Sequence, residues 1–317
     1  MYTMGYDIQV GDYKLGMLDK VEIHRSVELL ADTALVTLPA SEYNKTLDIE
    51  QQIHRGDAIT VLLGYKETGL REEFRGYVQR IGTDNGSITL ECEDELFKFR
   101  VPVPDAVLAD VSLEDLLKKV VEGVGGGYEI DCDYSWKYEK FVIHTSTGYD
   151  ILKKVQEECG ADIYLQGNTL HIHPPAAKVG ETVFYNFAYN VEECDLTYRR
   201  SEDRKVQVVV KALLPDGKVK EFEVGPAGGD RVEVRSATSD DASMKQRGET
   251  ELKRLSFDGY DGTISTWMIP YCEPGYVAQL HDADYDYKDG RYYIRAVTTE
   301  FSSSGGKRTI ELGIRLS

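Results

Sequence analysis

The sequence has little cysteine, and none of it is arranged to build a structural site. The five cysteines are isolated, odd in number and outside any C-x-x-C spacing: Cys92, Cys132, Cys159, Cys194 and Cys272. A disulfide framework or a zinc site needs paired or closely spaced cysteines. The pattern therefore argues against both, and it is typical of reduced thiols in a protein made in a cytoplasm.

Long apolar runs are missing as well. No stretch approaches the roughly 20 apolar residues that cross a bilayer. Residues 1–7 show no basic segment followed by an apolar run. The sequence therefore predicts no membrane-spanning segment and no signal peptide.

Positive charge is scarce. The 317 residues include 37 Lys and Arg against 55 Asp and Glu, which gives a formal net charge of −18. Proteins that bind nucleic acid tightly concentrate Lys and Arg at the phosphates, so tight nucleic-acid binding is not expected. Solubility is one explanation of so acidic a chain, and repulsion of DNA that passes nearby is another.

The common catalytic signatures are also absent. The sequence contains no G-x-S-x-G, no G-x-x-x-x-G-K-[ST], no H-E-x-x-H and no G-x-G-x-x-G. The glycines at 125–127 are not followed by a helix start, so they indicate a turn and not a phosphate-binding loop.

Two weak metal candidates remain. His171 and His173 fall on one face of an expected strand, but no Cys or carboxylate is close in sequence, and an exposed strand end is the alternative. Asp282, Asp284 and Asp286 have the D-x-D-x-D spacing of a calcium loop. The glycine and the bidentate glutamate of such a loop are missing, so an acidic hairpin loop is the alternative there.

Two pairs of adjacent carboxylates, Glu157-Glu158 and Glu192-Glu193, could do acid–base work in a glycosidase. In so acidic a chain such pairs are expected by chance. We therefore predict that the protein is not an enzyme, and we assign it no catalytic, cofactor-binding or metal-binding residues.

The most informative feature present is a repeated β-pattern. Residues 53–92 and 271–312 share a Gly-x-x-[Ile/Val] strand start, an aromatic-led strand, a turn with glycine and an alternating last strand. The number of residues from Gly56 to its counterpart Gly275 is nearly the same as the number from Tyr77 to its counterpart Tyr293. The repeat predicts that one barrel-like unit occurs twice, which points to assembly geometry before it points to an active site.

The segment between the repeats has a different pattern. Ser112 begins a helix with an apolar stripe, and a second helix begins near Thr147 and ends at Gly160. A hairpin with a turn at Gly167-Asn168 follows. These elements predict a small α/β module.

The chain is therefore divided into three predicted domains. Residues 1–104 form the first β-barrel and residues 105–189 the α/β module. Residues 190–317 form the second β-barrel, with an inserted helix near 240–255. The predicted fold class is mainly β with an α/β insert.

The C-terminal third has a recognisable order of motifs. A helix over 244–255 precedes a glycine-flanked strand at 259–263, and strand patterns follow at 269–277, 290–297 and 299–312. Together with the helix–glycine–strand element of the middle segment, this resembles the phage late-control D proteins, which are baseplate hubs of contractile tails. It is also similar to the hub part of type VI secretion spike (VgrG) proteins. Tyr276 departs from the pattern, which often has Asp after the glycine.

The resemblance implies a structural hub and not a catalyst. Its two domains would be tube-protein-like barrels, so that a homotrimer presents six of them and adapts a sixfold tail tube to a threefold spike. The implied partners are the tail tube protein, a central spike protein on a separate chain, and other baseplate proteins. The implied location is the tail baseplate of a virion or phage-like particle that is assembled in the bacterial cytoplasm.

Two alternatives stay open. One is a tail-associated cell-wall hydrolase, which would need paired carboxylates across a cleft. The other is a carbohydrate-binding β-protein, which would need an aromatic-lined sugar site.

Overall fold

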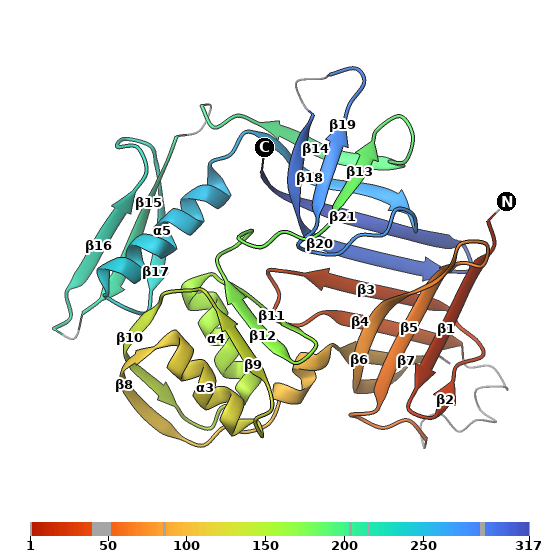
Figure 1. Cartoon of the computed structure of the whole chain (residues 1–317), viewed down its shortest axis with the longest axis horizontal. Helices are drawn as coiled ribbons and strands as arrows, with labels where there is room; N and C mark the ends of the chain where they lie inside the picture. Colours follow the sequence, from red (N-terminus) through yellow and green to blue (C-terminus); the bar gives the residue numbers. More distant parts are fainter. Residues whose placement is uncertain are drawn as a thin grey trace.

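A continuous sheet of 13 strands joins the two ends of the chain. The computed structural model describes residues 2–39, 52–84, 87–202, 205–214, 216–285 and 289–316. Strands from the N-terminal and C-terminal parts lie side by side in this sheet (Figure 1). The α/β segment lies beside the first part of the sheet, so the predicted mainly β fold with an α/β insert is confirmed.

The first β-unit is formed by the N-terminal strands. Buried residues alternate with partly exposed ones in the fifth strand, where Ile59, Val61 and Leu63 are buried. The strands are β1 (Met4–Val10), β2 (Tyr13–Lys14), β3 (Lys20–Ser26), β4 (Thr33–Pro39), β5 (Ala58–Tyr65), β6 (Gly69–Asp84) and β7 (Ser87–Glu93).

The second β-unit is formed mainly by the C-terminal strands and has its own apolar core around Ile264, Ile294 and Ile310. Its strands are β13 (Thr182–Asn186), β14 (Glu193–Arg199), β18 (Gly259–Trp267), β19 (Val277–His281), β20 (Gly290–Ser302) and β21 (Gly305–Arg315).

The two units have the same strand order. The first reads β1-β5-β6-β7-β4-β3 and the second β13-β19-β20-β21-β18-β14. One pairing differs, because β1 is antiparallel to β5 whereas β13 is parallel to β19. The duplication predicted from the sequence is thus confirmed in the strand order. Among the described strands no pairing joins the two ends of either unit, so each is an open, curved sheet.

The α/β segment between the units has well-defined helix ends. The Ser112 side chain caps the first helix by accepting from the Asp115 amide, and Thr147 and Asp150 form a reciprocal capping box at the second. Gly160 ends that helix in the left-handed conformation with a φ of 69°. A short 3-10 helix, η1 (Glu95–Phe99), leads into β8 (Ala106–Ser112), α3 (Leu113–Gly123), β9 (Glu129–Cys132), β10 (Lys137–Ile143), α4 (Gly148–Cys159), β11 (Asp162–Gln166) and β12 (Thr169–His173).

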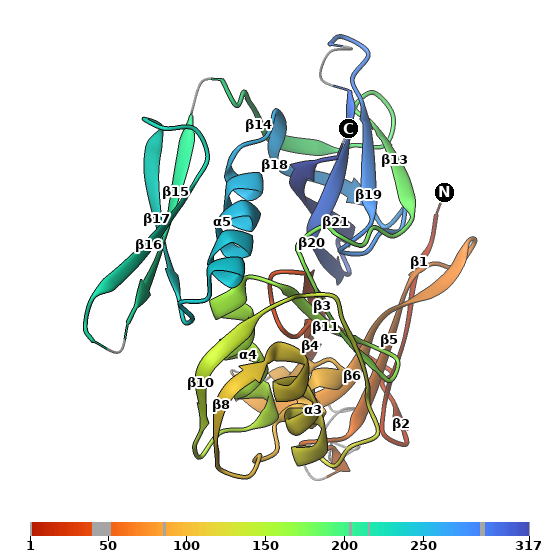
Figure 2. The same cartoon turned by 60° about the vertical axis from the view of Figure 1, so that its left-hand side comes forward.

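A separate three-stranded sheet is inserted between β14 and β18. Its strands are β15 (Val206–Leu213), β16 (Val219–Val224) and β17 (Asp230–Ser236). Helix α5 (Asp241–Leu255) lies on one face of this sheet, between it and the rest of the molecule (Figure 2). Val208, Val210 and Met244 form the apolar contact between the helix and the sheet.

Candidate functional site

The two β-units are joined by backbone pairing between β20 and β3. The pairs run from Ala296 opposite Ser26 to Ser302 opposite Lys20. The first part of β20 pairs with β19 on the same edge. Along this edge, β20 therefore pairs first with β19 and then with β3. We call the contact between β20 and β3, with the side chains around it, the unit seam.

A buried ion pair crosses the unit seam. Arg308 on β21 donates from Nη2 to Glu73 Oε1 on β6 at 2.6 Å, and the two side chains are 0% and 5% exposed. Arg308 Nη1 also donates to the backbone oxygens of Met268 at 2.7 Å and Pro270 at 2.9 Å. Burial raises the pKa of Glu73, and the charge of Arg308 opposes that rise. The pair therefore links the two units through a contact that is shielded from solvent.

A second polar cluster lies beside this pair. Arg25 on β3 donates to Asp32 at 2.9 Å and lies 3.3 Å from the Glu273 carboxylate of the second unit. The guanidinium groups of Arg71 and Arg308 each lie 5.1 Å from the ring centre of Tyr271. The cluster therefore adds cation–π contacts to the ion pairs between the units.

Apolar side chains also cross the unit seam. Met268 and Phe301 belong to the second unit, yet both are buried in the core of the first. The two units are therefore joined by backbone pairing, ion pairs and a shared part of the core.

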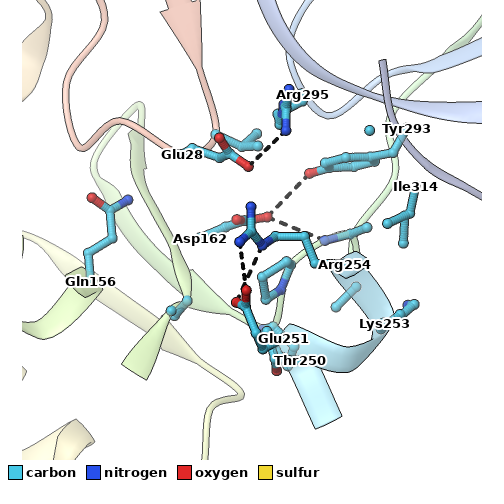
Figure 3. A pocket seen from close by; sticks show the side chains of 18 of the residues that line it. Glu28, Gln156, Asp162, Thr250, Glu251, Lys253, Arg254, Tyr293, Arg295 and Ile314 are labelled. Carbon is cyan, nitrogen blue, oxygen red and sulfur yellow. Dashed lines mark hydrogen bonds and ion pairs between the residues drawn. The ribbon is translucent and has the colours of Figure 1, made fainter. Parts of the chain in front are cut away.

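A cavity of about 1090 Å³ lies beside the seam, where the α/β segment, α5 and the second unit meet. Figure 3 shows Asp162 between Tyr293 and the side chains of α5. The Asp162 side chain accepts from the Tyr293 hydroxyl at 3.3 Å and from the Ala176 amide at 3.4 Å. Burial raises the pKa of Asp162 to about 7. The carboxyl group is therefore a polar link between three parts of the chain.

Some of the other charges of the cavity form ion pairs. Arg254 donates to Glu251 at 2.6 Å, and Arg295 lies 3.7 Å from Glu28 (Figure 3). Within the described residues, no group of three potential metal ligands is found. The first of these ion pairs lies within α5, and the second joins the second unit to the first.

His171 and His173, the candidate metal ligands of the sequence, lie close together, and both contact the side chain of Tyr164. His171 contacts Asp131 at 2.9 Å and stacks on Tyr164, with ring centres 5.0 Å apart. His173 Nε2 lies 3.1 Å from the Tyr164 hydroxyl, and burial lowers the pKa of His173. Both imidazoles are therefore engaged in the sheet packing of the α/β segment.

The acidic loop after β19 is organised by Asp289. Its carboxylate contacts His281 at 2.7 Å and accepts from the Asp282 amide at 2.8 Å, and Asp284 donates to Asp282 at 3.0 Å. Asp286, the third aspartate of the predicted spacing, lies outside the described residues. In the described part of this loop, Asp282 and Asp289 therefore take part in hydrogen bonds within the loop and with His281.

The structure separates the two carboxylate pairs from each other. Glu157 lines the cavity, whereas Glu158 is half-buried near Tyr138, and burial raises the pKa of Glu158. Glu192 and Glu193 lie at the start of β14, where Glu193 pairs with Lys307.

None of the described helices is long and apolar enough to cross a membrane.

The unit seam was not anticipated from the sequence. Glu73 and Arg308 stand in strands that carry several other charged residues, so the sequence does not single them out. A period-two pattern shows which face of a strand is buried, but it does not show which strand pairs with which edge.

The fold is shared along its whole length with tail proteins. A tail protein from Neisseria meningitidis MC58 superposes with a TM-score of 0.68 at 14% identity, over 98% of this chain and 97% of that one. The 43 kDa tail protein of prophage MuSo2 from Shewanella oneidensis gives 0.67 at 16% identity, over 98% of both chains.

A secretion-system protein has the same fold. The E. coli c3393 protein, a type VI secretion component with structural similarity to the T4 tail proteins gp27 and gp5, gives a TM-score of 0.61 at 8% identity. That match covers 98% of this chain and 77% of the other. No protein-family model matches the sequence, and no curated protein sequence matches it either. The predicted resemblance to tail and secretion-hub proteins is therefore confirmed at the level of the fold.

Proposed function

We propose that this protein is a structural baseplate hub of a contractile tail or phage-like injection machine, and that it acts as a homotrimer without enzymatic activity. The observation that carries the proposal is the duplicated strand order within one chain, with the two units joined through β20 and β3. The full-length fold likeness to tail proteins supports the same assignment.

The duplication suits an adaptor between two symmetries. Three chains supply six similar β-units, which can meet the six subunits around a tail tube. The same three chains remain related by a threefold axis, which can meet a trimeric spike. The proposed partners are the tail tube protein, a central spike protein and other baseplate proteins, in the tail of a particle assembled in the bacterial cytoplasm.

The mechanism of such a hub is mechanical. Its stiffness comes from the continuous sheet and from the buried Glu73–Arg308 pair, which hold the two units in one relative orientation. The excess of acidic residues suits a lumen to which a DNA polyanion does not adhere.

The test is a cryo-electron microscopy map of the intact particle in which this chain is present. We expect three copies at the junction of tube and spike, with the two units of each chain alternating around a ring. Six copies, a single copy, or a lumen lined with Lys and Arg would overturn the proposal.

A further inference from the structure

The separate sheet of β15, β16 and β17 and the helix α5 pack on each other as one unit, which we call the arm (residues 206–255; Figure 2). The buried apolar cluster of the arm consists of arm residues, among them Val208, Val210 and Met244. Gly248 lets α5 lie closely on the sheet, because a Cβ at this position would lie 2.6 Å from Val224 Cγ2. The helix is therefore fixed to the sheet of the arm.

The arm is connected to the second unit at one place. Strand β14 ends at Arg199 and β18 begins at Gly259, and these two residues lie opposite each other in the pairing of the two strands. Beside them, Asp258 accepts from the Ser201 amide at 2.7 Å and from the Ser201 hydroxyl at 3.1 Å. Two connections that leave from one point can act as a pivot, because they hold the base of the arm without fixing its angle.

The start of α5 meets the α/β segment through hydrogen bonds. The Ser243 hydroxyl oxygen accepts from the Lys137 amide at 3.2 Å. Just before the helix, the Ser239 amide donates to the Glu139 carboxylate at 2.8 Å. Both acceptor and donor groups on the α/β side belong to β10.

Further along the helix the contacts are polar as well. Arg247 and Thr250 follow Ser243 on the same face of α5. The Arg247 guanidinium lies against the backbone of Gly160, at the place that a Cβ would occupy. The Thr250 side chain lies beside the Tyr134 hydroxyl. The face of α5 that meets the α/β segment is therefore polar.

The charges of α5 do not bind the arm to the rest of the molecule. Every ion pair that α5 makes with a described residue stays within the arm: Lys220–Asp241, Lys245–Glu249, Arg247–Glu251 and Arg254–Glu251. An interface of few polar contacts permits relative motion, whereas a large apolar interface opposes it.

The other parts of the chain are joined by shared apolar cores. Met268 and Phe301 of the second unit are buried in the core of the first. Leu96 and Phe99, which follow the first unit, belong to the core of the α/β segment. These parts are held together, so the arm is the part whose attachment allows movement.

The cavity of about 1090 Å³ lies on the inner side of the arm. Residues between 246 and 255 of α5 line one side of it, and Tyr293 and Arg295 of the second unit line another (Figure 3). Movement of α5 away from the second unit would therefore open this cavity.

We propose that the arm swings as a rigid body about the pivot at Ser201 and Asp258, and that this movement opens the cavity to solvent. The inference goes beyond the proposed function and does not depend on it. The two β-units form the fixed frame, and the arm is the moving part.

The first experiment compares two buried positions of the arm by maleimide labelling. Ser243 is 1% exposed and faces the α/β segment, whereas Val208 is 0% exposed and faces α5 within the arm. Swinging uncovers position 243 and leaves position 208 covered. We expect Ser243→Cys to be labelled about tenfold faster than Val208→Cys, as peptide mass spectrometry would show. The native Cys92, buried in the core of the first unit, reports global unfolding in each sample.

Loss of a docking contact should increase the opening. Glu139→Ala removes the acceptor of the Ser239 amide and should raise the labelling rate of Ser243→Cys about fivefold. The labelling rate of Val208→Cys should not change. Glu129→Ala, at an exposed position of the same segment, is the matched control.

The second experiment measures the distance between the arm and the α/β segment by double electron–electron resonance. Spin labels are placed on Arg235→Cys and Lys140→Cys, two exposed positions, with Cys194→Ser to remove the exposed native thiol. We expect a second, longer distance whose population grows in Glu139→Ala. Fraying of the first turn of α5 also exposes position 243, but it leaves the arm in place and gives no second distance.

Selective labelling at position 243 that Glu139→Ala accelerates, together with the second distance, supports the hinge. If Ser243→Cys is labelled as slowly as Cys92, or if one distance is found in both proteins, the arm is fixed and the proposal is overturned. If Val208→Cys is labelled as fast as Ser243→Cys, the arm unfolds instead of swinging, which also overturns it. None of these outcomes alters the copy number in the particle, which tests the proposed function separately.

Discussion

Arg308 and Glu73 are 235 residues apart in sequence, and their side chains meet at 2.6 Å in the buried seam between the two β-units. The pair lies where β21 of the second unit faces β6 of the first. An ion pair in this position is satisfied only when the units are docked in one way. The Glu73–Arg308 pair is therefore a more direct probe of how the two units pack together than a surface contact is.

Glu73→Leu should destabilise the protein by about 3–5 kcal/mol, because it leaves the Arg308 charge buried without its partner. Urea unfolding followed by circular dichroism would measure this. Glu72→Leu is the control, since Glu72 pairs with Arg75 at the surface and its loss should cost about 1 kcal/mol or less. The double variant Glu73→Leu/Arg308→Met should recover much of the loss. Equal effects at the two glutamates would contradict the role assigned to the buried pair.

Phe301→Ala should cost about 3–5 kcal/mol, because this ring from the second unit fills part of the first unit's core. Phe184→Ala removes a ring that is 52% exposed and should change the free energy of unfolding far less. The same unfolding measurement compares the two variants. A small effect at Phe301 would mean that the first unit's core is complete without it.

The buried carboxyl group of Asp162 should make stability depend on pH. Its pKa is raised to about 7 by burial, and that of an unfolded aspartate is about 3.9. The folded state therefore holds the proton more tightly. The stability that this group contributes is fully present below about pH 4 and is lost as the pH rises towards 7, by up to a few kcal/mol.

Asp162→Asn should remove that part of the pH dependence, since an amide does not titrate. Free energies of unfolding measured at several pH values between 4 and 8 would show a flatter profile for this variant than for the native chain. Asp133→Asn, at an exposed position, should leave the native profile unchanged. A parallel decline in all three proteins would show that Asp162 stays ionised.

The protein should show no turnover of peptidoglycan or simple glycosides above background. The sequence shows no nucleophile, metal or acid–base signature, and two acidic groups of the cavity, Glu251 and Glu28, lie beside Arg254 and Arg295. Dye-release assays with a cell-wall substrate would check this, with a known lysozyme as the positive control. Clear turnover that a single carboxylate substitution abolishes would replace the structural assignment with an enzymatic one.

The local elements were predictable because their signals lie within a few residues. Ser112 and Thr147 each cap the helix that was expected after them, and Gly160 ends the second. The strand pattern around Ile59 and the duplication were also readable, because burial on one face imposes a period of two.

The pairing of strands that lie far apart in the sequence was not predictable from any single segment. Nothing local to Ala296 or Ser26 shows that they lie opposite each other, since register depends on edges far apart in the chain. The separate sheet of β15, β16 and β17 was missed as well: residues 190–317 were expected to form one β-barrel with an inserted helix, and a sheet apart from that unit was not expected. His171 and His173 share a face as expected, and only the position of Tyr164 shows what that face packs against.

The position of Phe301 and Met268 also bears on the order in which the chain can fold during synthesis. A ribosome releases the first unit's own strands early, yet two side chains of that unit's core are among the last part of the chain to be made. Until they emerge, the nascent first unit has an incomplete core and an unpaired β3 edge. Its final packing must therefore follow translation of the C-terminal strands, which makes the long-range pairing of β3 with β20 a late step with a high contact order.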